Sequence, residues 1–549
     1  MKLTALTACA TLLLSSTFAF AGPFDGMSAE ELFPGAANAQ ERDTAYKALM
    51  SANLPDARER FAGKHITIGV LAGGPRGGIS GPFFFWRNAF EKVTGAKLDI
   101  VELPFSGFLT STVADFATGQ NTYDVLTPGA WFYGDYMKGN WIAPIDEYFA
   151  DPAYPQWNRD AIAPALKKLM MWDGKWYGAL NDGDTQLLYY RKDVLTDPKW
   201  KAAFKEETGK DLPERPETWQ DLLAITKFFN GKDWNGDGDP DDGISMHLKG
   251  GGFGFFHFMS LAASFAIEPS PGDDATKRTD KYNMFWFDPE NMKPLINSPG
   301  QVAALEYLQE LATTGSPSQV SWDLSEAWND FLSGNAVAMF SFGDVGSLAE
   351  DPGASKIRGK LGSVRLPCST TWYSIADGTM KTSDEHPNCV GNTTGGSWHG
   401  VISAASKEPD LSYYLISMMA SPEINFWNVA YGWTGVDASS TLHLFPPRGE
   451  AKVEDYVATG YDAGDAKEFI DAYGENLFSY PTMQDFLRIP GTPAYWEALD
   501  THLAAVMSGQ SSAKDALDAT AAEWETITDD LGRDEQLELY RASINYQAN

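Results

Sequence analysis

The sequence is poor in cysteine and histidine, and beyond its first residues it has no long apolar run. Its 549 residues include three cysteines and seven histidines. The histidines are scattered, and none of the pairs that we compared (His65, His247, His257 and His399) has metal-ligand spacing. A transition-metal centre is therefore not indicated. After residue 21, no segment approaches the ~20 apolar residues of a membrane-spanning helix.

Basic residues are also scarce. Lys and Arg number 42 against 74 Asp and Glu, which gives a formal net charge of −32. Binding to nucleic acid or to an anionic membrane surface needs basic patches, so this balance argues against both classes of partner. Acidity itself favours solubility and indicates no particular function.

The only long apolar run lies at the start of the chain. A single Lys precedes the apolar run that includes residues 12–14, and small residues flank Phe20. This order is typical of a secretory signal peptide, which predicts residues 1–21 as the signal, cleavage after Ala21 and export of the mature protein to the periplasm. Cys9 is a poor lipobox cysteine, because it precedes the apolar run instead of following it.

Two cysteines, Cys368 and Cys389, remain after that cleavage. An even pair in an exported chain predicts a disulfide that closes a local loop, worth about 3 kcal/mol in the chain-entropy model. Two free thiols are the alternative.

The length exceeds what one hydrophobic core organises, so two or more domains are expected. Residues 22–63 are polar and predict a helical N-terminal extension in which no chemistry is evident. Aromatic residues make up 13% of the chain and include 18 Trp. Such residues fill large cores, and they also form surfaces that stack on sugar rings.

Regular strand and helix signals begin at residue 65. They predict strands over 65–71, 97–103 and 123–126 and helices over 84–93 and 108–118. Strands and helices that alternate with short connections form a parallel sheet covered by helices. Ligands of such sheets bind beyond the carboxyl ends of the strands, which selects a rim at 73–76, 105–107 and 128–131.

A second series of strand and helix signals follows the first. The expected elements are strands over 185–190, 337–340 and 400–404 and helices over 219–229, around 304–312 and from Ser512 onward. No long linker separates the two series. The sequence therefore predicts two α/β lobes that are interwoven along the chain.

Residues 233–243, "DWNGDGDPDDG", gather acidic side chains at regular spacing. Oxygen ligands at alternate positions, with Gly238 at the sixth, are typical of an EF-hand calcium loop. Hard oxygen donors without imidazole favour Ca²⁺. The expected ligands are Asp233, Asn235, Asp237, Asp239, Asp241 and Asp242.

The loop departs from the EF-hand pattern at its twelfth position, where Ile244 replaces the bidentate Glu. We therefore expect no second EF-hand helix, and the adjacent carboxylates at 241 and 242 to supply the missing ligand. The alternative is an acidic turn without metal, but so dense a cluster would repel itself. A bound calcium would be structural, since no acid or base partner is evident beside it.

Eight phrases along the chain carry a family resemblance. They are "AFEKVTGAKLDIVE" (89–102), "YDVLTPGAWFYGDYMKGNWIAPIDEY" (123–148), "DGKWYGALNDGDTQLLYYRKDVL" (173–195), "TWQDLLAITKFF" (218–229), "FDPENMKPLINSPGQVAALEYLQEL" (287–311), "AWNDFLSGNAVAMF" (327–340), "GGSWHGVISAASKEPDLSYYLISMMASPE" (395–423) and "RIPGTPAYWEALDTHLAAVMSGQ" (488–510). The chain resembles the extracellular solute-binding proteins of ABC importers, in the maltose-binding-protein-like group that binds carbohydrates and polyols. Its acidic loop is similar to the calcium loop of alginate-binding relatives.

The resemblance implies a two-lobe clamp with ligand held in the cleft between the lobes. The chain would cross between lobes near 182–184, 398–401 and 433–436. The implied domains are lobe 1 over 64–182 and 399–435 and lobe 2 over 183–398 and 436–549. Closure of the clamp would present both lobes to a membrane permease.

The resemblance also implies a set of ligand contacts: Arg76, Trp131, Asp182, Asp184, Asp344, Trp398 and Trp496. The chemistry fits, because a polyol offers hydroxyls that carboxylates bind and C–H faces on which indoles stack. Each residue also has an ordinary structural alternative. A Trp at a strand end can belong to the core, and an Asp can cap a helix or form a surface ion pair.

These features predict a monomeric periplasmic binding protein, not an enzyme, that delivers a carbohydrate or polyol to an ABC permease by hinge closure. Two alternatives stay open at this point. An exported glycoside hydrolase would need two carboxyl groups that flank the bond, roughly 5 Å apart in a retaining enzyme. An adaptor that reports its ligand to a sensor would have the same fold.

Overall fold

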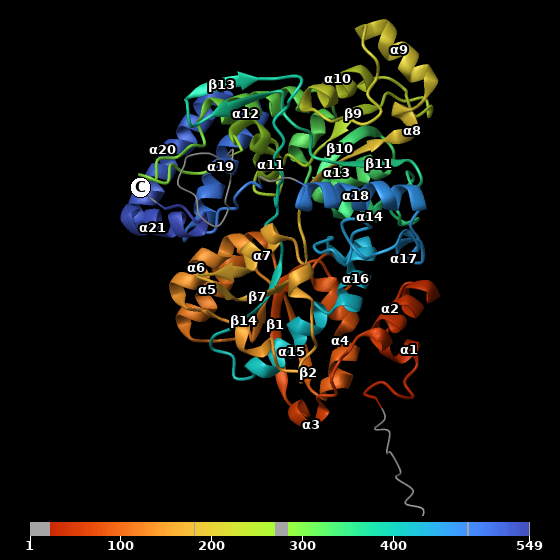
Figure 1. Cartoon of the computed structure of the whole chain (residues 1–549), viewed down its shortest axis with the longest axis vertical. Coiled ribbons are helices and arrows are strands. Elements are labelled where there is room, and N and C mark those ends of the chain that lie inside the picture. Colours follow the sequence, from red (N-terminus) through yellow and green to blue (C-terminus); the bar gives the residue numbers. More distant parts are fainter. Residues whose placement is uncertain (1–21, 181, 270–283, 480–482, 548–549) are drawn as a thin grey trace, which may run out of the picture.

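The computed structural model describes residues 22–180, 182–269, 284–479 and 483–547. Two α/β lobes, each built around its own β-sheet, lie one above the other along the long axis of the molecule (Figure 1). The predicted signal peptide lies outside the described residues. Within the described part, no helix has the length and apolar character needed to cross a membrane.

The sheet of the first lobe is mixed. Its order is β2 (Lys97–Leu103), β1 (His65–Leu71), β3 (Val125–Leu126), β14 (His399–Ser403) and β4 (Ile142–Ala143), with β7 (Gly178–Leu180) also paired to β14. Strand β1 is parallel to β2 and β3, as predicted. Strand β14 runs antiparallel to β3, β4 and β7, a feature that the sequence pattern did not indicate.

Helices flank this sheet (Figure 1). They are α4 (Ser80–Thr94), α5 (Phe108–Thr118), α6 (Tyr133–Gly139), α7 (Pro164–Met170), α15 (Pro409–Met419) and α16 (Pro422–Ala430). Helix α4 buries Phe83, Trp86, Phe90 and Val93, whose spacing of three and four residues places them on one face. Gly95 ends α4 in the left-handed conformation (φ 68°), which a glycine adopts without strain.

The N-terminal extension is helical and packs on the first lobe. It contains α1 (Ala29–Leu32), α2 (Ala39–Ser51) and α3 (Arg58–Phe61), and α2 lies along α16. Ser28 and Glu31 form a capping box that fixes the start of α1, and Asn38 caps α2. Thr44 of α2 bonds the Tyr431 hydroxyl (2.8 Å).

The sheet of the second lobe has four strands in the order β11 (Leu361–Arg365), β8 (Gln186–Arg191), β10 (Ala336–Phe342) and β9 (Asp242–Ser245). Every residue of β8 and β10 is buried, which explains why both read as continuous rather than alternating apolar runs. The surrounding helices are α8 (Lys192–Leu195), α9 (Pro198–Thr208), α10 (Trp219–Phe229), α11 (Gly254–Ala266), α12 (Pro299–Ala312), α13 (Leu324–Leu332), α14 (Asp344–Leu348), α17 (Val453–Val457), α18 (Ala463–Phe478), α19 (Thr492–Met507), α20 (Ala513–Leu531) and α21 (Arg533–Ser543).

The chain passes between the two sheets three times. It leaves the first sheet after β7, returns before β14, and leaves again after η6 (Gly432–Thr434) toward α18, which packs on β11. The segment 485–491, placed by the sequence in lobe 2, also contacts the first lobe. There, Arg488 Nη1 donates to the carbonyls of Leu169 and Met171 (both 3.0 Å), at the C-terminus of α7.

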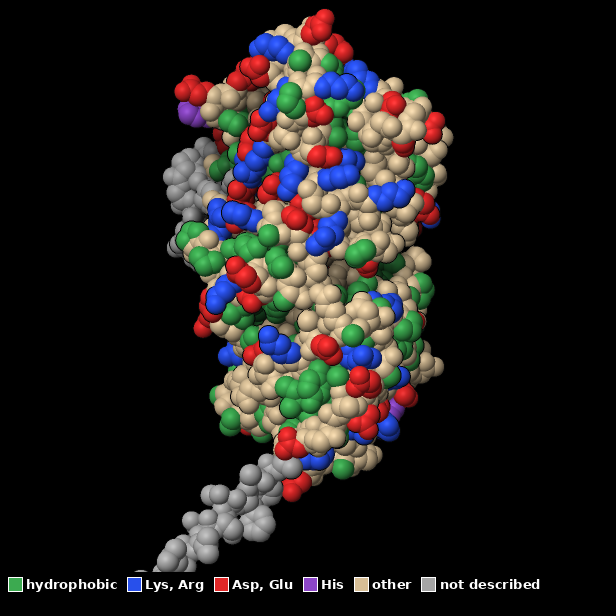
Figure 2. Space-filling view, turned by 90° about the vertical axis from the view of Figure 1, so that its right-hand side faces the viewer, with side chains coloured by type: hydrophobic (Ala, Val, Ile, Leu, Met, Phe, Trp, Pro, Cys, Tyr) green, Lys and Arg blue, Asp and Glu red, His purple; other side chains and the backbone are tan. Residues whose placement is uncertain are grey.

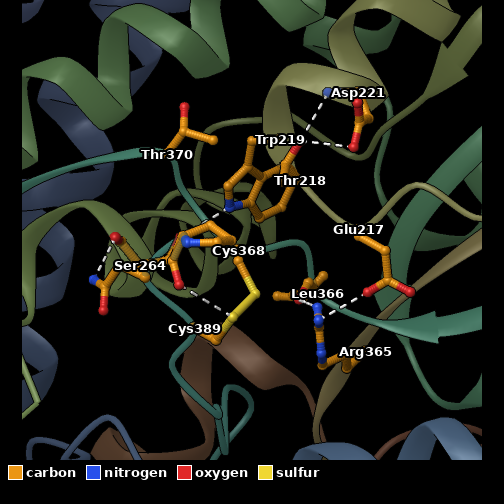
Figure 3. The surroundings of a disulfide bond; sticks show 12 residues. Glu217, Thr218, Trp219, Asp221, Ser264, Arg365, Leu366, Cys368, Thr370 and Cys389 are labelled. Carbon is orange, nitrogen blue, oxygen red and sulfur yellow. Dashed lines mark hydrogen bonds and ion pairs between the residues drawn. A yellow bond between two sulfur atoms is a disulfide. The ribbon is translucent and has the colours of Figure 1, made fainter. Parts of the chain in front are cut away.

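The predicted disulfide between Cys368 and Cys389 is present in the structure, with a Cα–Cα distance of 4.4 Å (Figure 3). Residues around it are tied to the start of α10, since the Cys368 N–H donates to Glu217 O (2.9 Å) and the Trp219 N–H donates to Cys368 O (3.0 Å). The loop that it closes carries a hairpin of β12 (Thr371–Ser374) and β13 (Thr379–Thr382). The disulfide thus links the start of α10 to the segment that leads from the second lobe back to β14.

Candidate functional site

A cleft lies between the lobes, where the three chain passages meet. Its volume is about 460 Å³, within the ~300–1,000 Å³ range of small-molecule sites. The first lobe contributes the loop after β1, together with Phe105 and Trp131. The predicted rim at the carboxyl ends of the strands therefore faces this cleft.

The second lobe and the passages complete the wall. Phe253, Phe256, Trp328 and Phe342 line the cleft from the second lobe, and Asp344 lies beside them at the start of α14. Further lining residues come from the chain passages: Asp182, Asp184, Gly395, Trp398, Trp433 and Gly435. A solute in the cleft would contact both lobes and the segments that connect them.

Aromatic side chains form most of the apolar surface. The Trp131 ring lies 5.2 Å from the Trp398 ring and 5.7 Å from the Trp496 ring. Phe105 of the first lobe meets Phe253 of the second, with ring centroids 4.5 Å apart. Trp131 and Phe105 also line an adjacent cavity of about 290 Å³, and it is this cavity that Trp496 faces.

Carboxylates cluster at the floor of the cleft. Asp182 and Asp184 lie in the passage before β8, and Asp437 lies in the passage after η6; their nearest oxygens are all within 4.8 Å of one another. The backbone N–H of Asp437 donates to Asp182 Oδ1 (2.8 Å), and the N–H of Gly343 donates to Asp437 Oδ2 (3.0 Å). Asp344 follows this glycine directly.

Burial and mutual repulsion change the electrostatics of these groups. Desolvation, with a smaller contribution from Asp344, raises the pKa of Asp182 to about 7. Desolvation also raises the pKa of Asp344 to about 6. The pKa values of Asp184 and Asp437 are raised well above their usual range by burial and by their acidic neighbours. Burial therefore disfavours the ionised form of all four carboxyl groups at the floor of the cleft.

The comparison with protein families agrees with this architecture. Residues 86–436 match the family model for bacterial extracellular solute-binding proteins. The chain belongs to this family. Curated protein sequences contain no significant match to it.

Solved structures place this solute-binding protein among two-lobe clamps. The D-mannitol-bound ABC transporter solute-binding protein of Agrobacterium vitis is 21% identical, with a TM-score of 0.59, over 85% of this chain and 99% of that one. The ribitol complex from Agrobacterium radiobacter is 19% identical, with a TM-score of 0.63 and coverage of 85% and 99%. Maltose-bound MalE3 of T. maritima is 18% identical, with a TM-score of 0.59 and coverage of 84% and 99%.

Arg76, a predicted ligand contact, lines the cleft of this solute-binding protein but is held by the N-terminal extension. Its Nη2 and Nη1 donate to Glu41 Oε1 (3.0 Å) and Oε2 (3.1 Å), and its guanidinium lies 4.3 Å from the centre of the Trp433 ring. Trp433 Nε1 also donates to Glu41 Oε1 (2.6 Å). Glu41 is 2% exposed, so an acidic residue of the extension anchors one edge of the cleft.

The acidic loop of this solute-binding protein lies on the second lobe, between α10 and β9, far from the hinge in sequence. Asp233, Asn235 and Asp237 each accept a hydrogen bond from a backbone N–H two or three residues later (2.8–3.0 Å). Asp241 accepts from the N–H groups of Trp234 (2.9 Å) and Asn235 (3.0 Å).

This geometry fits a cation only in part. The donor set is entirely oxygen, as Ca²⁺ requires. Among the described residues, however, the loop's carboxylates do not come together as a group of three with oxygens within 4.8 Å. Ile244 is buried in β9 and supplies no ligand, and desolvation raises the pKa of Asp242 to about 6.

Several residues that line the cleft or support its walls were not predicted as ligand contacts. Asp437 lies one residue beyond a predicted crossover, so proximity to that crossover was the available signal. Phe253 and Phe342 read as ordinary core positions. Glu41 had no signal, because its interaction with Arg76 joins the extension to a loop that only the folded chain brings near.

Proposed function

We propose that this solute-binding protein is the periplasmic binding component of an ABC importer and that it captures a carbohydrate or polyol between its lobes. The observation that supports the proposal most directly is the joining of aromatic faces and carboxylates in one interlobe cleft. Aromatic rings such as Trp131 stack on C–H faces, and carboxylates such as Asp184 accept hydrogen bonds from hydroxyls. The mannitol, ribitol and maltose bound to structures of this fold agree with that solute class.

Solute capture then follows from the architecture of the hinge. Trp131 belongs to the first lobe and Asp344 to the second, so a solute that bonds both stabilises the closed arrangement of the lobes. The passages at residues 182–185, 392–398 and 435–437 would absorb the rotation between the lobes. In the proposed cycle, the closed clamp docks on membrane permease subunits as a monomer and releases its solute chemically unchanged.

Thermal unfolding of the mature protein tests the solute class. We expect one of the added compounds, mannitol, ribitol, maltose or an acidic oligosaccharide, to raise the melting temperature, because solute at 100 times its Kd adds about 2.7 kcal/mol of stability. Trp131→Phe should weaken that solute's binding about tenfold through loss of stacking area. Trp200→Phe, in α9 and away from the cleft, serves as the matched control.

Two results would overturn the proposal. One is the absence of a shift with any hydroxyl-rich compound while a solute of another class binds tightly in the cleft. The other is the release of new reducing ends on incubation with glycans, which would make the protein a hydrolase.

We also propose that the loop from Asp233 to Asp242 binds a structural Ca²⁺. The all-oxygen donor set at alternate positions supports this, as does the density of negative charge, which an ion would neutralise. The residues that would hold the ion are Asp233, Asn235, Asp237, Asp239, Asp241 and Asp242. Its role would be to fix the connection between α10 and β9.

A further inference from the structure

Three carboxylates from two of the chain passages converge beneath the cleft. We call Asp182, Asp184 and Asp437 the hinge carboxylates; an oxygen of each lies within 4.8 Å of an oxygen of the other two. Asp182 is 1% exposed and Asp437 is 3% exposed. Three like charges removed from water in this way are costly unless a counter-charge accompanies them.

Basic side chains do not provide that counter-charge. Among the ion pairs of the described residues, none includes a hinge carboxylate. Arg76 lines the same cleft, but both of its Nη groups donate to Glu41. Arg76 is therefore neutralised by the extension, and among the described residues no basic side chain pairs with the acidic floor.

Hydrogen bonding at the hinge carboxylates is also incomplete. Asp182 Oδ1 accepts the Asp437 N–H, whereas no N–H or basic side chain of the described residues donates to the buried Oδ2. The hydroxyl of Tyr473, a fully buried residue, faces Asp437 and is a side-chain hydrogen-bond donor beside its carboxylate. This hydroxyl lies at the same place, because a Cβ added to Gly343 would contact both it and the two Asp437 oxygens. A buried carboxylate oxygen needs a proton, a water or an ion when no protein group donates to it.

We infer that the hinge carboxylates Asp182, Asp184 and Asp437 bind a hard divalent cation, with Ca²⁺ as the best fit. Calcium takes six to eight oxygen ligands at about 2.3–2.6 Å in flexible geometry. Two ligands of one such ion lie at most about 5 Å apart, and an oxygen of each hinge carboxylate lies within that separation of the other two. Asp182 and Asp184 also line the cleft, so the ion would lie at its floor and leave positions for water or solute hydroxyls.

An organic ammonium group is the competing occupant, and the structure favours the metal ion. Asp437 does not line the cleft, so a cation that contacts all three carboxylates must lie below the cleft surface. That region is crowded: a Cβ at Gly183 would come within 2.5 Å of the Ser439 side chain. A bare ion fits such a space more readily than the carbon chain attached to an ammonium group.

Calcium binding to the mature protein after exhaustive dialysis against EDTA tests this inference by isothermal titration. The loop variant Asp237→Ala/Asp239→Ala removes ligands of the separate acidic loop and isolates the hinge. In this background we expect one Ca²⁺ per chain, and at least about tenfold weaker binding after a further Asp437→Asn or Asp182→Asn change. Glu350→Gln alters another buried carboxylate of the second lobe and should leave Ca²⁺ binding unchanged.

A second measurement avoids any change at the hinge. Tb³⁺ added to the loop variant should show luminescence sensitised by aromatic rings near the hinge, such as that of Tyr473, and Ca²⁺ should compete it away. The inference is overturned if the loop variant binds no Ca²⁺ and shows no competed Tb³⁺ signal. It is also overturned if hinge substitutions abolish the binding of a diamine such as putrescine while the loop variant binds no Ca²⁺. Because no solute is added, these outcomes are independent of the solute class proposed above.

Discussion

The two acidic groups of this protein differ in how their charge is arranged and satisfied. The loop at 233–242 is contiguous in sequence, mostly exposed, and its carboxylates accept hydrogen bonds from their own turn. The hinge carboxylates come from passages 255 residues apart, as in the contact between Asp437 and Asp182. They are buried, and within the described part of the chain no N–H or basic side chain donates to Asp182 Oδ2.

This difference shows that the density of acidic residues along the sequence is a poor measure of how much their carboxylates destabilise the fold when no cation is bound. In the loop, water and backbone N–H groups solvate each carboxylate, so a cation adds to an arrangement that is already satisfied. At the hinge, burial removes water and brings like charges together, and only a proton or a cation can offset the cost. The sparser group of carboxylates has the greater need for a partner.

The largest expected effect is that Ca²⁺ reverses which protein is more stable, the wild type or a hinge variant. In EDTA, Asp437→Asn should stabilise the protein by about 3 kcal/mol, because it removes a buried carboxyl group that must either ionise beside two others or take up a proton, while an amide oxygen can still accept the Gly343 N–H. In millimolar Ca²⁺ the order should reverse, since the wild type then gains the binding energy. Urea denaturation in both buffers measures the two differences.

Glu350→Gln is the control for that reversal. Glu350 is buried in the second lobe but accepts the Asp462 N–H (2.7 Å) and lies 3.4 Å from Arg358. Its substitution should change stability equally with and without Ca²⁺. A hinge variant that behaves like this control would mean that the hinge carboxylates meet no metal ion.

The next effect concerns the loop's internal hydrogen bonds. Asp241→Ala should destabilise the second lobe by about 2 kcal/mol even without metal, because the carboxylate accepts the N–H groups of Trp234 and Asn235. Urea denaturation in EDTA measures it. If the variant loses no stability in EDTA, the loop is held by its ion and not by its own hydrogen bonds.

Much of the fold was predictable because its elements follow local patterns. Strands β1 and β2 and helices α5 and α10 begin and end where the sequence placed them. Alternating apolar residues, helix caps and glycine stops act within a few residues, so one sequence contains the whole signal. Strand β14 shows the limit, since its antiparallel pairing with β3 joins residues far apart in the chain.

The candidate site was predictable where the strand-end rim, a crossover or the family resemblance marked it. Asp182, Asp184 and Trp398 lie in predicted passages and line the cleft. Asp437 and Glu41 were missed, because their roles depend on partners that only tertiary folding brings near. Whether each predicted residue contacts the solute stays a prediction until a complex is measured.

A smaller effect is expected from calcium at the loop itself. In the Asp437→Asn background, which isolates the loop, Ca²⁺ at 10 times its Kd should add about 1.4 kcal/mol of stability. Addition and chelation of Ca²⁺ should therefore raise and lower the melting temperature reversibly, and Asp233→Asn should remove the response. If the melting temperature changes neither on addition nor on chelation of Ca²⁺, the loop is a turn held only by its hydrogen bonds.

The smallest effect is expected at the exposed tip of the loop. In EDTA, Asp239→Ala should change stability by less than about 0.5 kcal/mol, because the side chain is exposed and the substitution touches no buried feature. Its backbone N–H still donates to Asp237 Oδ1 (3.0 Å) after the change. Asp239→Ala and Asp241→Ala each remove one negative charge from the same loop, but Asp241→Ala also removes an acceptor of two backbone hydrogen bonds. Comparison of the two variants therefore separates the effect of charge from that of hydrogen bonding. Equal losses of stability in urea for the two variants would show that negative charge, and not the bonded geometry of Asp241, governs the loop.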